Sequence, residues 1–94
     1  MKLETIFARL LKDNRKKCGY SQETLALLAN VDRTFISMLE GGKRQPTLTT
    51  LFSLAKAQNI NPSVIVREIE QETNFDSMES DSYVNAINTK RSRN

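Results

Sequence analysis

The feature that most constrains this chain is a pair of short helical segments separated by about three residues. Apolar side chains recur at helical spacing over residues 22–29 and again over residues 32–40. Ser21 is a candidate N-cap for the first segment, and Gly41 with Gly42 ends the second, because glycine is costly inside a helix. Two helices joined by so short a turn must cross steeply, as in a helix-turn-helix.

Three further helices are predicted around this pair. Residues 3–18 carry an apolar stripe, and Gly19 follows as a natural C-terminal stop. Thr47 is placed to cap a fourth helix, and Asn61 before Pro62 marks the start of a fifth. The sequence therefore predicts an all-α fold of five short helices.

The 94 residues have room for one domain. We expect this domain over residues 1–70 and a polar tail over residues 71–94. The tail has too little apolar surface to offset the entropy of ordering, so we expect it to be mostly disordered or to contact a dimer or protein partner. Residues 1–69 contain 11 of the 14 Lys and Arg residues but only 6 of the 11 Asp and Glu residues. The cationic character therefore belongs to the domain.

The composition excludes several classes of function. The chain has no His, which removes His-based acid–base catalysis, His-assisted nucleophiles and His-ligated metals. Cys18 is the single cysteine, so no internal disulfide is possible, and a lone thiol suits a reducing, cytoplasmic setting. No apolar run approaches the roughly 18 residues of a membrane span. We expect no enzymatic activity, no cofactor, no metal site and no membrane association.

Three sequence patterns together resemble the phage-repressor/Cro-like (XRE) helix-turn-helix family. They are S-Q-E-x-L-A at residues 21–26, I-S-x-L-E-x-G at 36–42 and P-x-L-x-x-L-x-x-L-A at 46–55. They occur in order and at the family's mutual spacing, within a match over about residues 6–69. The resemblance implies a five-helix, lambda-repressor-like DNA-binding domain of a prokaryotic or phage type, in which the second and third helices form the helix-turn-helix.

The resemblance also implies roles for residues near the third helix, whose N-terminal half would enter the major groove of duplex DNA. The implied base-reading residues are Arg33, Thr34, Ser37 and Met38. The implied phosphate-binding residues are Gln22, Gly41, Gly42, Lys43 and Arg44. Arg33 suits bidentate contact with guanine. Alternatively, Arg33 contacts phosphate or water, Thr34 and Ser37 are ordinary surface residues, and Lys43 with Arg44 forms a solvated loop.

Other residues have structural roles in this comparison. Arg15 and Glu40 match the family's paired Arg and Glu, which implies a partly buried ion pair between the first and third helices. The apolar positions predict a core of Leu10, Leu11, Leu25, Ala26, Ala29, Val31, Ile36, Leu39, Leu48, Leu51, Leu54, Ala55 and Ile60.

The implied function is that of a sequence-specific transcriptional regulator, a repressor or controller, that binds a pseudo-palindromic operator as a homodimer. One recognition helix reads too few base pairs for high specificity, so two half-sites are expected. The predicted dimer surface is apolar and lies on the last helix, at Val64, Ile65, Val66 and Ile69. The alternative is a protein-binding module on the same fold, such as an antitoxin, whose contact surface would include Leu27 and Leu28.

Overall fold

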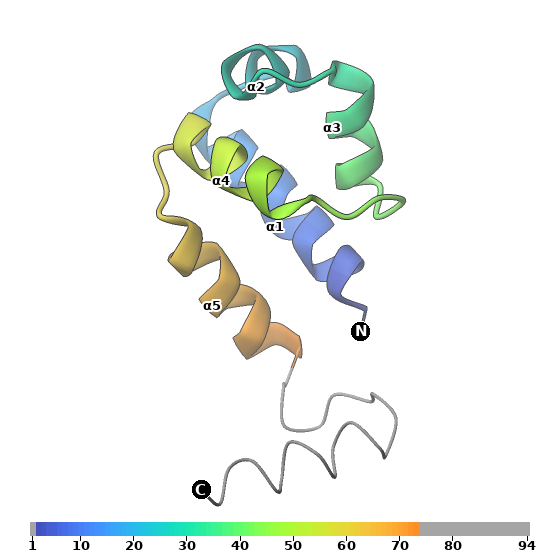
Figure 1. Ribbon diagram of the computed structural model, residues 1–94, viewed down its shortest axis with the longest axis vertical. Coiled ribbons are helices and arrows are strands. Elements are labelled where there is room, and N and C mark those ends of the chain that lie inside the picture. Colours follow the sequence, from blue (N-terminus) through green and yellow to red (C-terminus); the bar gives the residue numbers. More distant parts are fainter. Residues whose placement is uncertain (1, 74–94) are drawn as a thin grey trace, which may run out of the picture.

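The computed structural model describes residues 2–73, which form five helices and no strand (Figure 1). The helices are α1 (Leu3–Cys18), α2 (Gln22–Ala29), α3 (Arg33–Glu40), α4 (Leu48–Ala57) and α5 (Pro62–Thr73). The all-α, five-helix prediction is confirmed. Helix α5 extends three residues beyond the predicted domain end at residue 70, and the predicted disorder of the tail from residue 74 onward lies outside the described residues.

The helix starts follow the capping residues only in part. Ser21 Oγ accepts a hydrogen bond from the backbone N–H of Thr24 at 3.0 Å, and Thr47 Oγ1 accepts one from Thr50 at 3.1 Å. Each bond satisfies a backbone donor in the first turn that has no partner within the helix. Asp32 occupies the N-cap of α3 with extended backbone, but its side chain makes no capping bond. The start of α3 therefore lacks the side-chain cap that α2 and α4 have.

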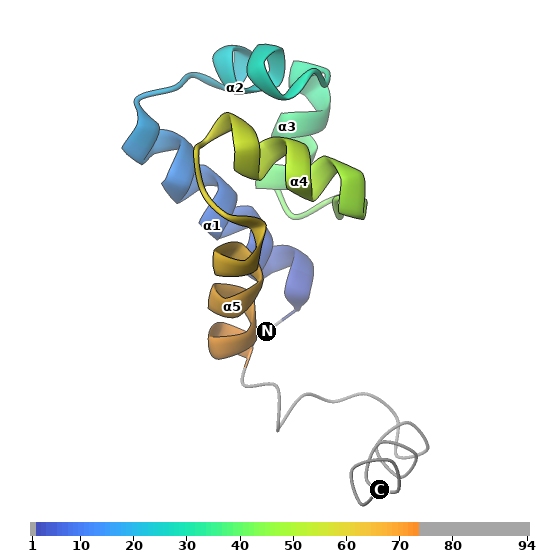
Figure 2. The same cartoon turned by 60° about the vertical axis from the view of Figure 1, so that its left-hand side comes forward.

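The turn between α2 and α3 depends on a left-handed residue. Asn30 has φ 59° and ψ 47°, and its backbone N–H donates to α2, as does that of Val31, which reaches Ala26 O at 2.9 Å. Asparagine adopts this conformation more readily than most side chains. The chain therefore leaves α2 and enters α3 within three residues, which produces the steep crossing visible in Figures 1 and 2.

The core lies where the inner faces of all five helices meet. Helix α3 packs on α1 and α2, α2 packs on α4, and α5 packs on α1 and α4 (Figure 2). An exposed ion pair between Arg9 of α1 and Glu72 of α5 joins the two helices near the end of the described chain. The buried apolar side chains that cluster here are Phe7, Leu11, Leu25, Ala26, Ala29, Ile36, Leu39, Leu51, Leu54, Ala55 and Ile65.

Three of the predicted core residues are not fully buried. Val31 and Ile60 are only half-buried and pack against the edge of the cluster. Leu48, at the first position of α4, is 72% exposed, so its assignment to the core is wrong. It lies one turn before Phe52, which is 54% exposed, on the outer face of α4, because Leu51, Leu54 and Ala55 already occupy the inner face.

No helix in residues 2–73 combines the length and apolar character that crossing a membrane requires.

Candidate nucleic-acid interface

Helix α3 presents a polar face to solvent and an apolar face to the core. Ile36 and Leu39, three residues apart, are fully buried. Arg33, Thr34 and Ser37 are exposed on the opposite side. The two buried side chains therefore fix α3 on the core. The three polar side chains, all within the first five residues of α3, point away from the protein.

Met38 differs from the other three residues predicted to read bases. Its side chain is half-buried, whereas Arg33, Thr34 and Ser37 are exposed. It adjoins the buried Leu39 on the helix and lies at the border between the polar and apolar faces. A smaller fraction of the Met38 side chain is therefore accessible to a partner than of the other three side chains.

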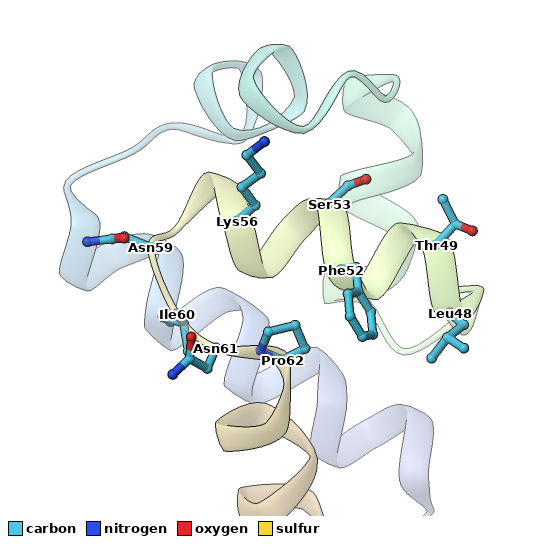
Figure 3. A pocket seen from close by; sticks show the side chains of 9 residues that line it. All are labelled: Leu48, Thr49, Phe52, Ser53, Lys56, Asn59, Ile60, Asn61 and Pro62. Atoms are coloured by element: carbon cyan, nitrogen blue, oxygen red, sulfur yellow. The ribbon is translucent and has the colours of Figure 1, made fainter.

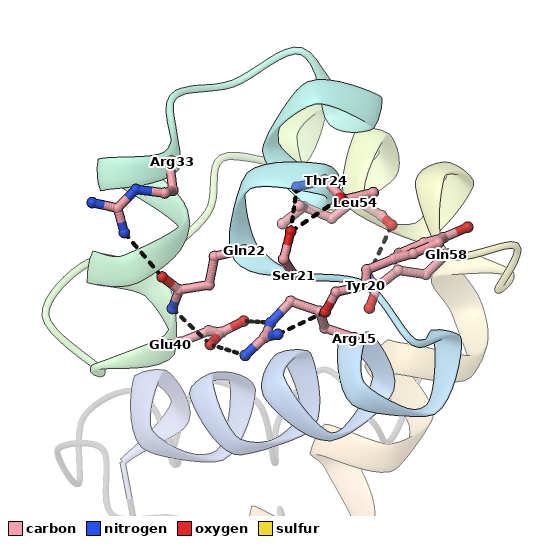
Figure 4. A network of polar contacts seen from close by, with 9 residues as sticks. All are labelled: Arg15, Tyr20, Ser21, Gln22, Thr24, Arg33, Glu40, Leu54 and Gln58. Carbon is pink, nitrogen blue, oxygen red and sulfur yellow. Dashed lines mark hydrogen bonds and ion pairs between the residues drawn. The ribbon is translucent and has the colours of Figure 1, made fainter.

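A nearly buried ion pair joins α1 to the end of α3 (Figure 4). Arg15 Nε lies 2.6 Å from Glu40 Oε2, and Arg15 NH2 lies 3.1 Å from Glu40 Oε1. Their side chains are only 11% and 4% exposed. Arg15 NH1 also donates to the backbone oxygen of Tyr20 at 2.8 Å. The hydrogen bond with Glu40 raises the pKa of Arg15 above its usual value, so Arg15 is a fixed cation at this junction.

Gln22 connects this ion pair to the exposed face of α3. Its Nε2 donates to Glu40 Oε1 at 3.1 Å, and its Oε1 accepts from Arg33 NH1 at 3.3 Å (Figure 4). Sequence reasoning placed Gln22 on phosphate and did not foresee either bond. The sequence carried one indication of these bonds: the amide of Gln can donate to a carboxylate and accept from a guanidinium at the same time.

The glycine pair after α3 has a different role from the one predicted. The backbone N–H of Gly41 donates to Ser37 O at 3.0 Å, and that of Gly42 donates to Leu39 O at 3.1 Å. These amides satisfy the last carbonyls of α3 and are not free to bind phosphate, so the predicted phosphate contacts through them are wrong. Gly42, at φ 72°, reverses the chain after the helix, a conformation that other side chains rarely adopt.

The loop after these glycines carries two exposed cations, Lys43 and Arg44. The guanidinium carbon of Arg44 lies 6.0 Å from the centroid of the Phe35 ring, at the outer limit of a cation–π contact. Phe35 is itself half-buried against the core from α3. Arg44 is thereby held close to α3.

The predicted dimer surface on α5 is divided by the fold. Val64 and Val66 are exposed, but Ile65 is only 3% exposed within the core of a single chain, and Ile69 is half-buried against it. Ile65 therefore cannot contact a second chain, and its assignment to the interface is wrong. The four-residue spacing of Ile65 and Ile69 places both on the side of α5 that covers α1 and α4.

Sequence reasoning also missed an apolar groove beside α4 (Figure 3). Leu48 and Phe52 line it from α4, Ile60 lines it from the loop after α4, and Pro62 lines it from the start of α5. The polar side chain of Lys56 lies at its edge. Leu48 and Phe52 in this groove are exposed apolar side chains, as are Val64 and Val66 on α5.

Helix α2 has a second apolar surface. Leu27 is 80% exposed and Leu28 is also exposed, on the side of α2 that does not pack against α3 and α4. Both were expected to lie outside the core, and the structure places them there.

The model of the helix-turn-helix family matches residues 11–65. Among curated relatives, the control protein C.SmaI of Serratia marcescens is 36% identical over 69 residues, which cover 72% of this chain and 82% of that protein. The crystal structure of the restriction-modification controller protein C.AhdI from Aeromonas hydrophila is similar, with 36% identity and a TM-score of 0.63. The match covers 70% of this chain and 94% of that one. The controller C.Esp1396I, solved as a tetramer in complex with its natural 35 base-pair operator, has 29% identity and a TM-score of 0.69. This match covers 77% of this chain and 95% of that one.

Proposed function

The chain belongs to the helix-turn-helix family, and on that premise we propose that it regulates transcription by binding duplex DNA sequence-specifically through α3. The observation that carries the proposal is the polar row of Arg33, Thr34 and Ser37 on a helix whose opposite face is fully buried. A helix of this width fits the major groove, which is about 12 Å wide. The proposed action is therefore occupancy of an operator.

Within this function, Arg33 is the main reader of sequence. Its guanidinium can donate two parallel hydrogen bonds to the O6 and N7 of guanine, the commonest specific contact. Thr34 and Ser37 are short hydroxyl side chains that bond either base type, while the half-buried Met38 contributes apolar contact with a thymine methyl at most. Discrimination should therefore be concentrated at one guanine in each half-site.

The proposed phosphate contacts flank the reading face. Gln22 lies at the N-terminus of α2, where free backbone N–H groups favour an anion. Lys43 and Arg44 are exposed in the loop after α3. Contacts on both sides of α3 would fix the register of the helix in the groove without carrying sequence information.

We further propose that the chain acts as a homodimer of the controller type. C.SmaI and C.AhdI are named as controllers, and C.Esp1396I assembles on its operator. The proposed dimer surface now consists of the groove residues Leu48 and Phe52 together with Val64 and Val66. These are exposed apolar side chains on α4 and α5, and burying them against a second copy would remove their area from water. The operator would then contain two half-sites about one helical turn, or a multiple of it, apart.

Selection of bound sites from a random duplex pool at stated salt, with the mass of the complex measured, tests this function. We expect a pseudo-palindromic sequence occupied by two chains or a multiple of two. A complex of one chain with one half-site would contradict the homodimer. Equal binding to all sequences would contradict sequence-specific regulation.

A protein-binding role is the second candidate, because Leu27 and Leu28 are both exposed on α2. A stoichiometric protein complex that survives high salt and buries these leucines would favour it. Binding to duplex DNA that weakens steeply with salt would favour the regulator, since phosphate neutralisation releases counterions.

A further inference from the structure

The amide of Gln22 has only one orientation that satisfies both of its neighbours. Glu40 offers only acceptors and Arg33 offers only donors, while the amide has one acceptor and two N–H groups. Turned by half a rotation, the amide would bring its oxygen against a carboxylate oxygen and its N–H groups against a guanidinium. The carboxylate of Glu40 therefore determines that the Gln22 oxygen faces Arg33.

Glu40 is the rigid end of this line of hydrogen bonds, and Arg33 is the free end (Figure 4). Glu40 is nearly buried and bound by two parallel N–H groups of Arg15, a geometry that fixes both the position and the plane of its carboxylate. Arg33 is exposed and, without a partner, would sample many rotamers whose ordering costs free energy on binding. The bond from Gln22 limits that freedom before any ligand arrives.

We infer that Glu40 is a positioning residue for sequence readout, which orients Arg33 toward the bases through Gln22. The inference rests on the proposed function, in which Arg33 reads a guanine. The line of bonds leaves the necessary donors free: Gln22 keeps its second N–H for a phosphate, and Arg33 keeps four of its five N–H groups. A residue that touches no DNA thus influences which base is preferred.

Two double variants separate the acceptor at position 40 from the ion pair. Arg15→Met/Glu40→Gln and Arg15→Met/Glu40→Met both remove the two buried charges and replace them with side chains of similar volume, which folds generally tolerate. Only the first keeps a carbonyl oxygen that can accept from Gln22. The two variants are therefore matched in charge and differ in the amide at position 40, which supplies the acceptor for Gln22 and two N–H groups of its own.

The readout is base discrimination measured by Kd at one fixed salt concentration. Each protein is titrated with the selected operator, with the operator changed at the guanine assigned to Arg33, and with random duplex. That guanine is identified as the position whose change weakens the wild type but not Arg33→Ala. We expect Arg15→Met/Glu40→Gln to keep most of the wild-type discrimination and Arg15→Met/Glu40→Met to lose about fivefold, the typical effect of one hydrogen bond.

Random duplex should bind both double variants equally, because the phosphate contacts are unchanged. Equal discrimination by the two variants would overturn the inference and leave only a structural role for Glu40. Failure of the proposed function would look different, since the wild type itself would then show no preference for any operator over random duplex.

The variant Gln22→Met decides the matter if circular dichroism shows that either double variant is unfolded. It breaks the connection between Glu40 and Arg33 but leaves the ion pair of Arg15 and Glu40 intact. Loss of a phosphate contact would weaken all sequences alike and cancel in the ratio of Kd values. A loss of about fivefold in discrimination at the guanine supports the inference. Unchanged discrimination there overturns it.

Discussion

Replacing Glu40 by Gln should destabilise the fold far more than any change to an exposed ion pair. Glu40→Gln keeps the shape of the side chain but removes the charge that faces Arg15. The Arg15 side chain is 11% exposed, so its cation would stay nearly buried without a counter-charge. Breaking a buried pair by removing one partner costs about 3–5 kcal/mol, and we expect about 3 kcal/mol because the guanidinium retains its bond to Tyr20.

This loss is large compared with the total stability of such a domain. The 72 described residues suggest a free energy of unfolding of about 4–11 kcal/mol. For a domain of this size, each kcal/mol shifts Tm by roughly 4–8 °C, so a fall of about 12–24 °C is expected. Urea denaturation followed by circular dichroism measures the free energy, and a calorimetric scan measures Tm.

The matched control is Glu72→Gln, which removes a carboxylate from the exposed pair with Arg9. Exposed ion pairs contribute about 0–1 kcal/mol, so this variant should unfold almost as the wild type does. The double variant Arg15→Met/Glu40→Met should recover most of the stability that Glu40→Gln loses, because no charge is then left buried. If Glu40→Gln and Glu72→Gln have equal effects, the reasoning from burial is refuted.

Three further predictions concern the DNA and dimer surfaces. Arg33→Ala should cost about 1–3 kcal/mol on the selected operator and leave binding to random duplex nearly unchanged; equal losses on both would show that Arg33 contacts phosphate. Lys43→Ala should weaken all sequences alike and reduce the slope of log K against log salt by about one, and an unchanged slope would exclude a phosphate contact. Phe52→Asp should shift the dimer toward monomer in sedimentation equilibrium without unfolding it, because this ring is 54% exposed in the single chain. An unchanged dimer constant would place the interface elsewhere.

The parts of the fold that depend on local chemistry followed from the sequence. Ser21, Gly19 and the glycines after Glu40 are signals read over a few residues, and the helix bounds that they predict agree with the structure. Periodicity likewise placed Ile36 and Leu39 in the core, since residues three apart lie on the same face of a helix, and a short surface helix buries only one face. The exposed face of α3 follows from the same pattern.

The errors arose where one helix end meets another element. Leu48 fits the apolar pattern of α4, but it is the first residue of that helix and lies on its outer face. The neighbouring helices cover the inner face, which carries Leu51. Ile65 was assigned to a dimer surface because apolar spacing shows which residues share a face, not what covers it. The amides of Gly41 and Gly42 were assigned to phosphate because the sequence does not show which carbonyls lie within their reach.

The sequence by itself determined five helices, the sharp turn before α3 and the residues that α3 presents, because capping, glycine placement and helical period act over one or two turns. Only the tertiary structure decided that Gln22 lies between Glu40 and Arg33. These residues come from α2 and both ends of α3, and the ion pair to α1 adds a fourth chain segment. Hydrogen bonds act over about 3 Å, so contacts between such distant segments exist only once the helices have packed.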